Sequence, residues 1–191
     1  MPLFLTGPRG IGKSTALRRA IAAPGQSPGG IMTVFDAPRG SEEKRLWLLP
    51  WSPEPDYTAG AVCARMGPAG REVYAEVFDG LGVQLLERSE REEGTSLIVL
   101  DELGFLEADA LRFRETVLRL LRGPKPVLGV VRQGLGAWGD APLGKLLEVT
   151  EENREEIPAR ILKWLAQAGE TPRFGAYTLL KPYDFSKVYN A

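Results

Sequence analysis

The feature that most constrains the fold is a glycine-rich stretch of eight residues near the start of the chain. It follows the apolar run Leu3–Leu5 and leads into Ser14–Ile21, which has helical spacing. The stretch matches the pattern G-x-x-x-x-G-K-[ST] with Gly7, Pro8, Arg9, Gly10, Ile11, Gly12, Lys13 and Ser14. Between a strand and a helix, such a loop turns consecutive backbone N–H groups toward a phosphate. The sequence therefore predicts a phosphate-binding loop that continues into the helix at Thr15.

Two side chains of this loop carry the chemistry expected of it. Lys13 would reach the β- and γ-phosphates of a nucleotide, and the Ser14 hydroxyl would ligate Mg²⁺. Arg9, at the tip of the loop, either contacts a phosphate or points into solvent. The sequence thus predicts a nucleoside triphosphate as the ligand and Mg²⁺ as its cofactor.

A pair of adjacent carboxylates follows the most apolar run of the chain. Ser96–Leu100 is typical of a strand covered on both faces, and it ends in Asp101 and Glu102. Ligands of an open α/β sheet gather at the carboxyl ends of its strands, so we expect this pair beside the phosphate loop. Asp101 would hold Mg²⁺, and Glu102 would orient and deprotonate an attacking water. Taken alone, the two acids could instead begin a polar loop or cap the next helix.

Strand-like and helix-like segments alternate through the body of the chain. We expect helices over Glu72–Arg91 and Glu107–Arg122, a buried strand over Val127–Val131 and a short strand over Leu146–Val149. This alternation predicts an α/β fold, a three-layer sandwich around a mostly parallel central sheet.

Other segments are less regular. The β-leaning runs 31–36 and 44–51 predict a hairpin appended to the main sheet. Residues 52–70 contain several Pro and Gly without an apolar period, which predicts a mobile loop. Thr150 is a candidate N-cap of the last helix, and Pro158 implies either a kink or a fresh helix start.

Composition narrows the possible chemistry. The 191 residues include no His, which excludes Ser-His-Asp and Cys-His catalysis and His-rich zinc sites. The single Cys63 cannot form an internal disulfide, which fits a reducing compartment. A net charge of −1 gives no extended basic surface for a nucleic acid or an anionic membrane. With no signal peptide or membrane span in the sequence, we expect a soluble cytoplasmic protein that binds no membrane.

Three stretches together resemble the small cancer-related nucleoside-triphosphatase family, a group of P-loop proteins that hydrolyse nucleoside triphosphates to diphosphates. The stretches, in the family's order and spacing, are Gly7–Thr15, Asp101–Glu107 and Thr150–Arg154. The resemblance implies a RecA-like sheet core, Mg²⁺ at Ser14 and Asp101, and a catalytic Glu102.

The resemblance also implies roles for residues outside the first two motifs. Asn153 and Arg154 would lie near the nucleotide, although a capping role or a surface ion pair explains them equally well. Arg65, in an Arg-hydrophobic-Gly stretch, would close over the γ-phosphate and act in catalysis with Lys13 and Glu102. The alternative for Arg65 is a solvated side chain on a loop.

The chain departs from the family pattern within the second motif, and its hairpin after the first helix is less charged than the family's. Phe105 stands where the family usually has a basic or small residue. The resemblance covers about residues 1–168, so we expect a nucleotide-binding domain over this range and a C-terminal extension over 169–191.

Three functions are compatible with these features. The first is a Mg²⁺-dependent phosphohydrolase that cleaves the β–γ bond of nucleoside triphosphates. The second is a nucleotide or small-molecule kinase, with an acceptor site formed by the loops 52–70 and 132–144. The third is a nucleotide-responsive binding module with an aromatic surface for a partner or for self-association, unless these aromatics pack onto the domain. The aromatic residues concerned are Trp47, Trp51, Trp138, Phe174, Tyr177, Tyr183, Phe185 and Tyr189.

Overall fold

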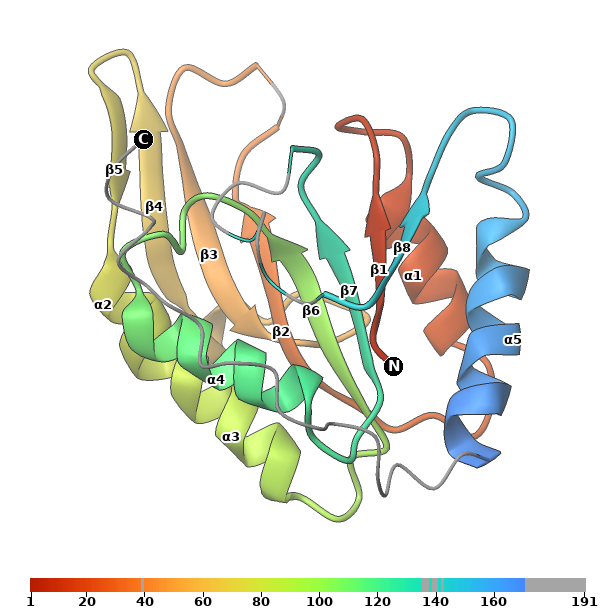
Figure 1. Ribbon diagram of the computed structural model, residues 1–191. Coiled ribbons are helices and arrows are strands. Elements are labelled where there is room, and N and C mark those ends of the chain that lie inside the picture. Colours follow the sequence, from red (N-terminus) through yellow and green to blue (C-terminus); the bar gives the residue numbers. More distant parts are fainter. Residues whose placement is uncertain (39, 135–137, 139–140, 142, 171–191) are drawn as a thin grey trace.

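A central sheet of eight strands organises the molecule (Figure 1). The computed structural model describes residues 1–170 except 39, 135–137, 139–140 and 142. The strand order is β5-β4-β3-β2-β6-β7-β1-β8. The parallel strands are β2 (Pro28–Phe35), β6 (Leu97–Leu103), β7 (Val127–Val131), β1 (Leu3–Thr6) and β8 (Lys145–Glu148). The antiparallel strands β3 (Lys44–Pro50), β4 (Ala61–Gly67) and β5 (Gly70–Val73) extend the sheet beyond β2.

Helices cover both faces of this sheet (Figure 1). Helices α1 (Lys13–Ile21) and α5 (Ile157–Glu170) lie on one face. Helices α3 (Val83–Arg91) and α4 (Leu111–Leu121) lie on the other, together with the short α2 (Ala75–Val77) and the π-helical turn Phe78–Gly82. The three-layer α/β sandwich with a mostly parallel core is therefore confirmed. None of the helices in the described ranges is long and apolar enough to cross a membrane.

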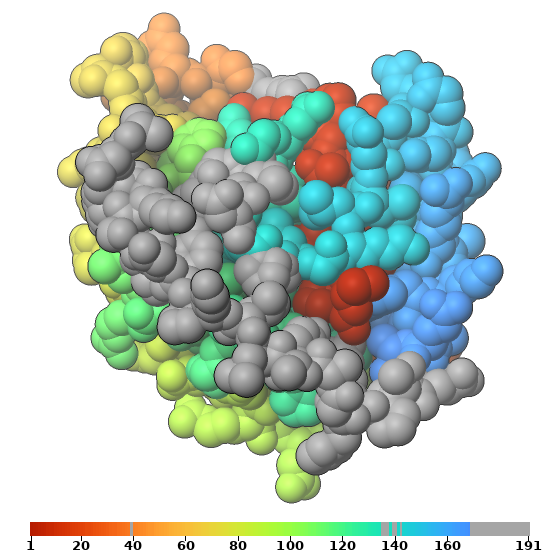
Figure 2. Space-filling model, viewed as in Figure 1, coloured from red at the N-terminus to blue at the C-terminus, as the bar shows by residue number. Residues whose placement is uncertain are grey.

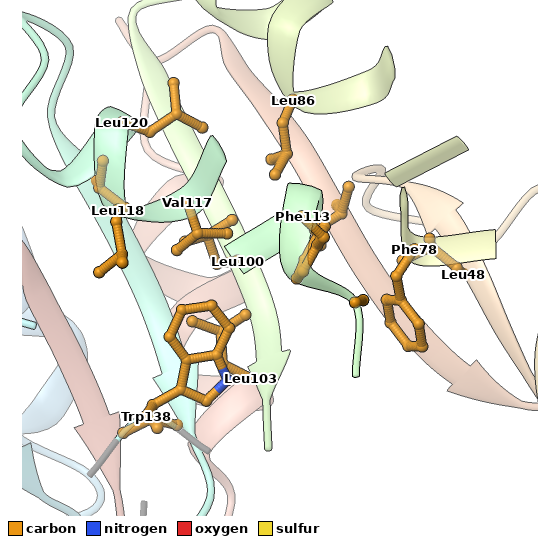
Figure 3. Packing of buried hydrophobic residues seen from close by; sticks show 14 of the residues in the cluster. Leu48, Phe78, Leu86, Leu100, Leu103, Phe113, Val117, Leu118, Leu120 and Trp138 are labelled. Carbon is orange, nitrogen blue, oxygen red and sulfur yellow. The ribbon is translucent and has the colours of Figure 1, made fainter. Parts of the chain in front are cut away.

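Alternation along the strands creates two separate hydrophobic cores. In β1, Leu3 and Leu5 pack with α1 and α5, whereas Phe4 faces the other way, toward α3 and α4. Figure 3 shows the core under α4, where Phe113 and Val117 point toward the sheet. On the opposite side, α5 lies beside the start of the chain, as the neighbouring blue and red atoms of Figure 2 show. There Trp164 Nε1 donates to Met1 O at 3.1 Å.

The aromatic surface expected for a partner is wrong at one position. Trp138 is 1% exposed, and its ring centroid lies 6.5 Å from that of Phe113. Trp47 and Trp51 are half-buried. The remaining aromatics of that hypothesis lie outside the described residues.

The region after β2 differs most from expectation. Strands β2 and β3 do pair as an antiparallel hairpin, but β2 also pairs in parallel with β6 and so belongs to the main sheet. The loop predicted over 52–70 is wrong, because it contains the 3₁₀ turn Tyr57–Ala59 and strand β4. This strand buries only small side chains, Cys63 and Ala64, on its core side. It therefore lacks the large apolar residues that mark a strand in a sequence.

The helix predicted over Glu72–Arg91 is interrupted at its start. Residues Gly70–Val73 form β5, and the regular helix α3 begins only at Val83. A Cβ atom at Gly82 would lie 2.9 Å from Phe113 Cδ2, so the glycine permits close packing against α4. The preceding turn also supports α4, since Asp79 Oδ1 accepts a hydrogen bond from Phe113 N at 2.9 Å.

The last helix begins later than Thr150. Helix α5 begins at Ile157, with Pro158 in its first turn, so the proline marks a fresh start and Thr150 does not cap this helix. Helix α5 ends at Glu170, and the domain boundary after 168 stays a prediction.

Candidate active site

The phosphate loop and the carboxylate pair border one cavity at the carboxyl ends of the parallel strands. Its volume is about 670 Å³, and its lining includes Gly7, Lys13, Ser14, Asp101 and Glu102. Strand β7 separates β1, which leads into the loop, from β6, which carries the carboxylates. The expected meeting of the two motifs therefore occurs across one intervening strand.

Backbone conformation gives the loop its shape. Gly7 has φ 133° and Gly12, directly before α1, has φ 109°, a region that favours glycine. A Cβ atom at Gly7 would also lie 2.5 Å from the carbonyl oxygen of Val149 at the end of β8. The loop thus depends on glycine at this position for both conformation and space.

Lys13 lies buried inside the loop that it follows. Its side chain is 7% exposed, and Nζ donates to Gly7 O at 2.9 Å and to Pro8 O at 3.0 Å. Burial lowers the pKa of this amine, while Glu102 and Asp101 act in the opposite direction. The ammonium group is therefore held at the mouth of the loop, where a phosphate oxygen would take the place of the carbonyls.

Ser14 and Asp101 meet directly. Ser14 Oγ donates to Asp101 Oδ1 at 2.8 Å, and Asp101 is only 5% exposed. Burial raises the pKa of this carboxyl, and the hydrogen bond from Ser14 opposes that shift.

This oxygen pair fits Mg²⁺. No cluster of three or more His, Cys, Asp or Glu suited to a metal occurs in the part of the chain that the structure describes. Mg²⁺ commonly takes only one or two protein oxygens and completes its shell with phosphates and water. Ser14 and Asp101 supply oxygens of that kind beside the loop.

Glu102 occupies an irregularity in β6. Asp101 pairs with Val130 and Leu103 pairs with Val131, so Glu102 has no partner on β7. Such an extra residue redirects a side chain and is common beside active sites. The Glu102 side chain is half-buried and borders the cavity.

Other residues predicted for the nucleotide lie around the loop. Arg9 borders the cavity, and its Cζ lies 5.7 Å from the centroid of the Phe35 ring. Ile11 packs against the core on the α1 side, and Thr15 is exposed.

Asn153 and Arg154 do not border this cavity. Asn153 joins the turn after β8, since Oδ1 accepts from Thr150 N and Nδ2 donates to Glu148 O, each at 2.9 Å. Arg154 is exposed, with Nε 3.7 Å from Glu155 Oε1. Any role of these two residues at the nucleotide stays a prediction.

Arg65 does not border this cavity. It pairs with Glu72 across the β4–β5 hairpin, whereas its neighbour Met66 pairs with Arg71. Cross-strand partners share a face of the sheet. Met66 and Arg71 border the cavity at the phosphate loop, called the nucleotide cavity below. Arg65 instead lines a neighbouring cavity of about 720 Å³. The two cavities share Met66 and Arg71, and a role of Arg65 at the γ-phosphate stays a prediction.

Four residues on the cavity wall had no predicted role. Glu107 is 2% exposed, its Oε2 accepts from Gly104 N at 3.0 Å, and burial raises its pKa. Phe105, Arg71 and Arg132 also line the cavity. Arg132 directly follows the buried strand β7, the same signal that identified Asp101 after β6.

Comparison with known proteins decides the family. The family model described as NTPase matches residues 2–162. The chain belongs to the NTPase family. The resemblance noted from its motifs is therefore confirmed, and the chain is an enzyme that hydrolyses nucleoside triphosphates.

This NTPase is similar to two curated archaeal proteins, each named nucleoside-triphosphatase THEP1. The protein from Methanocaldococcus jannaschii is 29% identical over 173 residues, which cover 85% of this chain and 95% of the relative. The protein from Pyrococcus abyssi is 29% identical over 167 residues, covering 85% and 90%. The crystal structure of THEP1 from Aquifex aeolicus shares the fold of this NTPase, with a TM-score of 0.65 and 21% identity over 86% of this chain and 99% of that one.

Proposed function

We propose that this NTPase is a Mg²⁺-dependent phosphohydrolase that cleaves the β–γ bond and releases a nucleoside diphosphate and phosphate. The observation that carries the proposal is the 2.8 Å contact between Ser14 Oγ and Asp101 Oδ1 beside the buried Lys13. It joins the loop that holds phosphates to the strand that carries Glu102.

Each side chain then has a distinct role. Lys13 and the loop N–H groups bind the β- and γ-phosphate oxygens. Mg²⁺ bound by Ser14 and Asp101 would neutralise charge on the same two phosphates. Glu102 orients a water molecule and accepts its proton as the water oxygen bonds to the γ-phosphorus. The bond from that phosphorus to the bridging oxygen breaks, the diphosphate leaves, and the proton on Glu102 returns to solvent or to the released phosphate.

Phosphate release from ATP, GTP, CTP and UTP tests this mechanism, with Mg²⁺ and with EDTA. We expect Glu102→Gln to lower kcat by about 100- to 10,000-fold while nucleotide still binds, because only proton transfer is removed. Lys13→Ala should lose nucleotide binding. Glu115→Gln and Lys163→Ala are matched controls, since both residues are exposed and lie on α4 and α5.

Two outcomes would contradict the proposal. Hydrolysis by Glu102→Gln at the wild-type rate would show that Glu102 is not the base. Undiminished hydrolysis in EDTA would show that the reaction does not need Mg²⁺. The same reactions separate hydrolysis from transfer, because a kinase would release little phosphate without an added acceptor and would place the γ-phosphate on that acceptor.

A further inference from the structure

Arg132 follows a central strand of the sheet, at the edge where the candidate active site lies. Strand β7 ends at Val131 and lies between β1 and β6, so Arg132 follows it between the phosphate loop and the carboxylate pair. The backbone N of Arg132 donates to Leu103 O at 2.9 Å, which fixes the start of this residue against β6. Its side chain borders the nucleotide cavity.

A second arginine, from an outer strand of the sheet, borders the same cavity. Arg71 belongs to the outer strand β5. Its Cζ lies 4.5 Å from the centroid of the Phe105 ring, and the Cζ of Arg132 lies 4.5 Å from the same centroid. Both guanidinium groups are within the range of cation–π attraction. The half-buried ring thus holds two like charges at one wall of the cavity.

Neither guanidinium group has an anionic partner within the described part of the chain. Among the residues that the structure describes, no ion pair or side-chain hydrogen bond involves Arg71 or Arg132. Lys13 lines the same cavity as Arg132 and Arg71. Both arginines are partly solvated, and together with Lys13 they make the potential of this cavity positive, which favours an anion. A terminal phosphate has the charge and the size for this space.

We propose that Arg132 is a catalytic residue of this NTPase that binds the γ-phosphate, with Arg71 as a second contact and Phe105 as the positioning residue for both. This inference rests on the proposed hydrolysis of the β–γ bond. As that bond breaks, negative charge spreads over the γ-phosphate oxygens and the bridging oxygen. A planar guanidinium group donates two parallel hydrogen bonds to such oxygens. Arg65, the residue that the sequence suggests for this task, does not border the nucleotide cavity, whereas Arg132 does.

Steady-state hydrolysis of ATP and GTP by Arg132→Ala tests the assignment. We expect kcat to fall by about 100- to 1,000-fold, with binding of ADP and the midpoint of thermal unfolding unchanged. ADP with aluminium fluoride and Mg²⁺, which imitates the transferring phosphate, should bind the variant no more tightly than ADP alone. Added guanidinium ion at millimolar concentration should restore part of kcat. Arg122→Ala is the matched control, since this exposed arginine lies at the C-terminal end of α4 and does not border the nucleotide cavity.

Phe105 requires a readout that packing alone would not move. Phe105→Leu keeps an apolar side chain without a π face, so we expect kcat to fall with unchanged KM and unfolding midpoint. Phe105→Tyr keeps the ring face and should retain the wild-type kcat. Equal kcat in Phe105→Leu and the wild type would overturn the positioning role.

The outcomes separate this inference from the proposed function. If the wild type releases no phosphate, the proposed function fails before Arg132 is tested. If the wild type is active and Arg132→Ala keeps its kcat, Arg132 is not catalytic. A loss that follows Arg65→Ala or Arg71→Ala while Arg132→Ala stays active would also overturn the assignment. So would loss of ADP binding or of thermal stability in Arg132→Ala, because both indicate a structural role.

Discussion

The side chains that would bind the nucleotide already have partners within the protein. Lys13 donates to two carbonyls of its own loop, and Ser14 donates to Asp101. Phosphate and Mg²⁺ would therefore replace existing hydrogen bonds, and such an exchange contributes little net free energy. Affinity should come mainly from bringing opposite charges together in a partly buried site.

Gly7 is the residue on which the shape of the loop depends most directly. We expect Gly7→Ala to lower the free energy of unfolding by about 1–3 kcal/mol and to abolish nucleotide binding, because the new Cβ would meet Val149 O in a backbone conformation that favours glycine. Urea unfolding and titration with a fluorescent nucleotide measure the two effects. Gly94→Ala is the control, since its Cβ would have no neighbour within 4 Å. Equal behaviour of the two variants would contradict this account of the loop.

Local signals predicted one part of the site and not the other. The loop and Asp101 can be recognised from the sequence because each directly follows an apolar run that predicts a strand. The roles of positions 65 and 71 depend on the register of β4 with β5, and a shift of one residue exchanges the two faces. No pattern within either strand reveals that register.

At the scale of elements, β4 shows how a strand can be concealed by its composition. Its core side carries Cys63 and Ala64, and prolines and glycines flank it on both sides. Pairing with β3 and β5 makes it a strand, since these partners satisfy its backbone. The helix predicted before α3 fails for the same reason: β5 pairs with β4, which the sequence alone does not show.

Cys63 provides a test of the burial of β4. Burial, with a smaller contribution from Glu107, raises the pKa of this thiol from 9.0 to about 12. The unfolded chain therefore ionises first as pH rises, and stability due to the buried thiol falls between about pH 9 and 12. Relative to Cys63→Ala, we expect the wild type to lose about 1 kcal/mol of unfolding free energy between pH 7.5 and 10, measured in urea.

Thiol labelling gives an independent check of the same strand. At pH 8 the native wild type should react with a disulfide reagent only as fast as it unfolds, while the urea-unfolded chain should react at once. Rapid labelling of the native protein, or a pH-independent difference from Cys63→Ala, would mean that β4 is not packed as described.

For the whole molecule, alternating segments were enough to predict the layers but not the order of the strands. The parallel core follows from apolar runs covered on both faces, such as those of β6 and β7. The extension by β3, β4 and β5 depends on contacts between strands, and their polar outer positions resemble those of loops. The burial of Trp138 is hidden for a related reason: Ala137 and Gly139 flank it in the sequence, yet it packs under α4 beside Phe113 (Figure 3).

Phe113 joins the helical layer to the sheet on that side. Its ring contacts Phe78 and Trp138, with centroids 5.5 and 6.5 Å away, and it packs closely against Gly82. We expect Phe113→Ala to lower the free energy of unfolding by about 3–5 kcal/mol, because it leaves a cavity among these groups. Urea unfolding followed by tryptophan fluorescence measures the loss. Leu111→Ala, at a position that is 46% exposed in the same helix, should change stability far less. A comparable loss in both variants would contradict this view of the core.

The order of the strands also bears on solubility. The described sheet ends in β5 on one side and β8 on the other, and each has only four residues. Arg71 and Glu72 mark the first edge, and exposed Lys145 and Glu148 mark the second. Charged side chains on short outer strands discourage edge-to-edge pairing between molecules, the first step of β-aggregation. Arg71, proposed to contact the γ-phosphate, would thus also discourage pairing of β5 with a strand of another molecule.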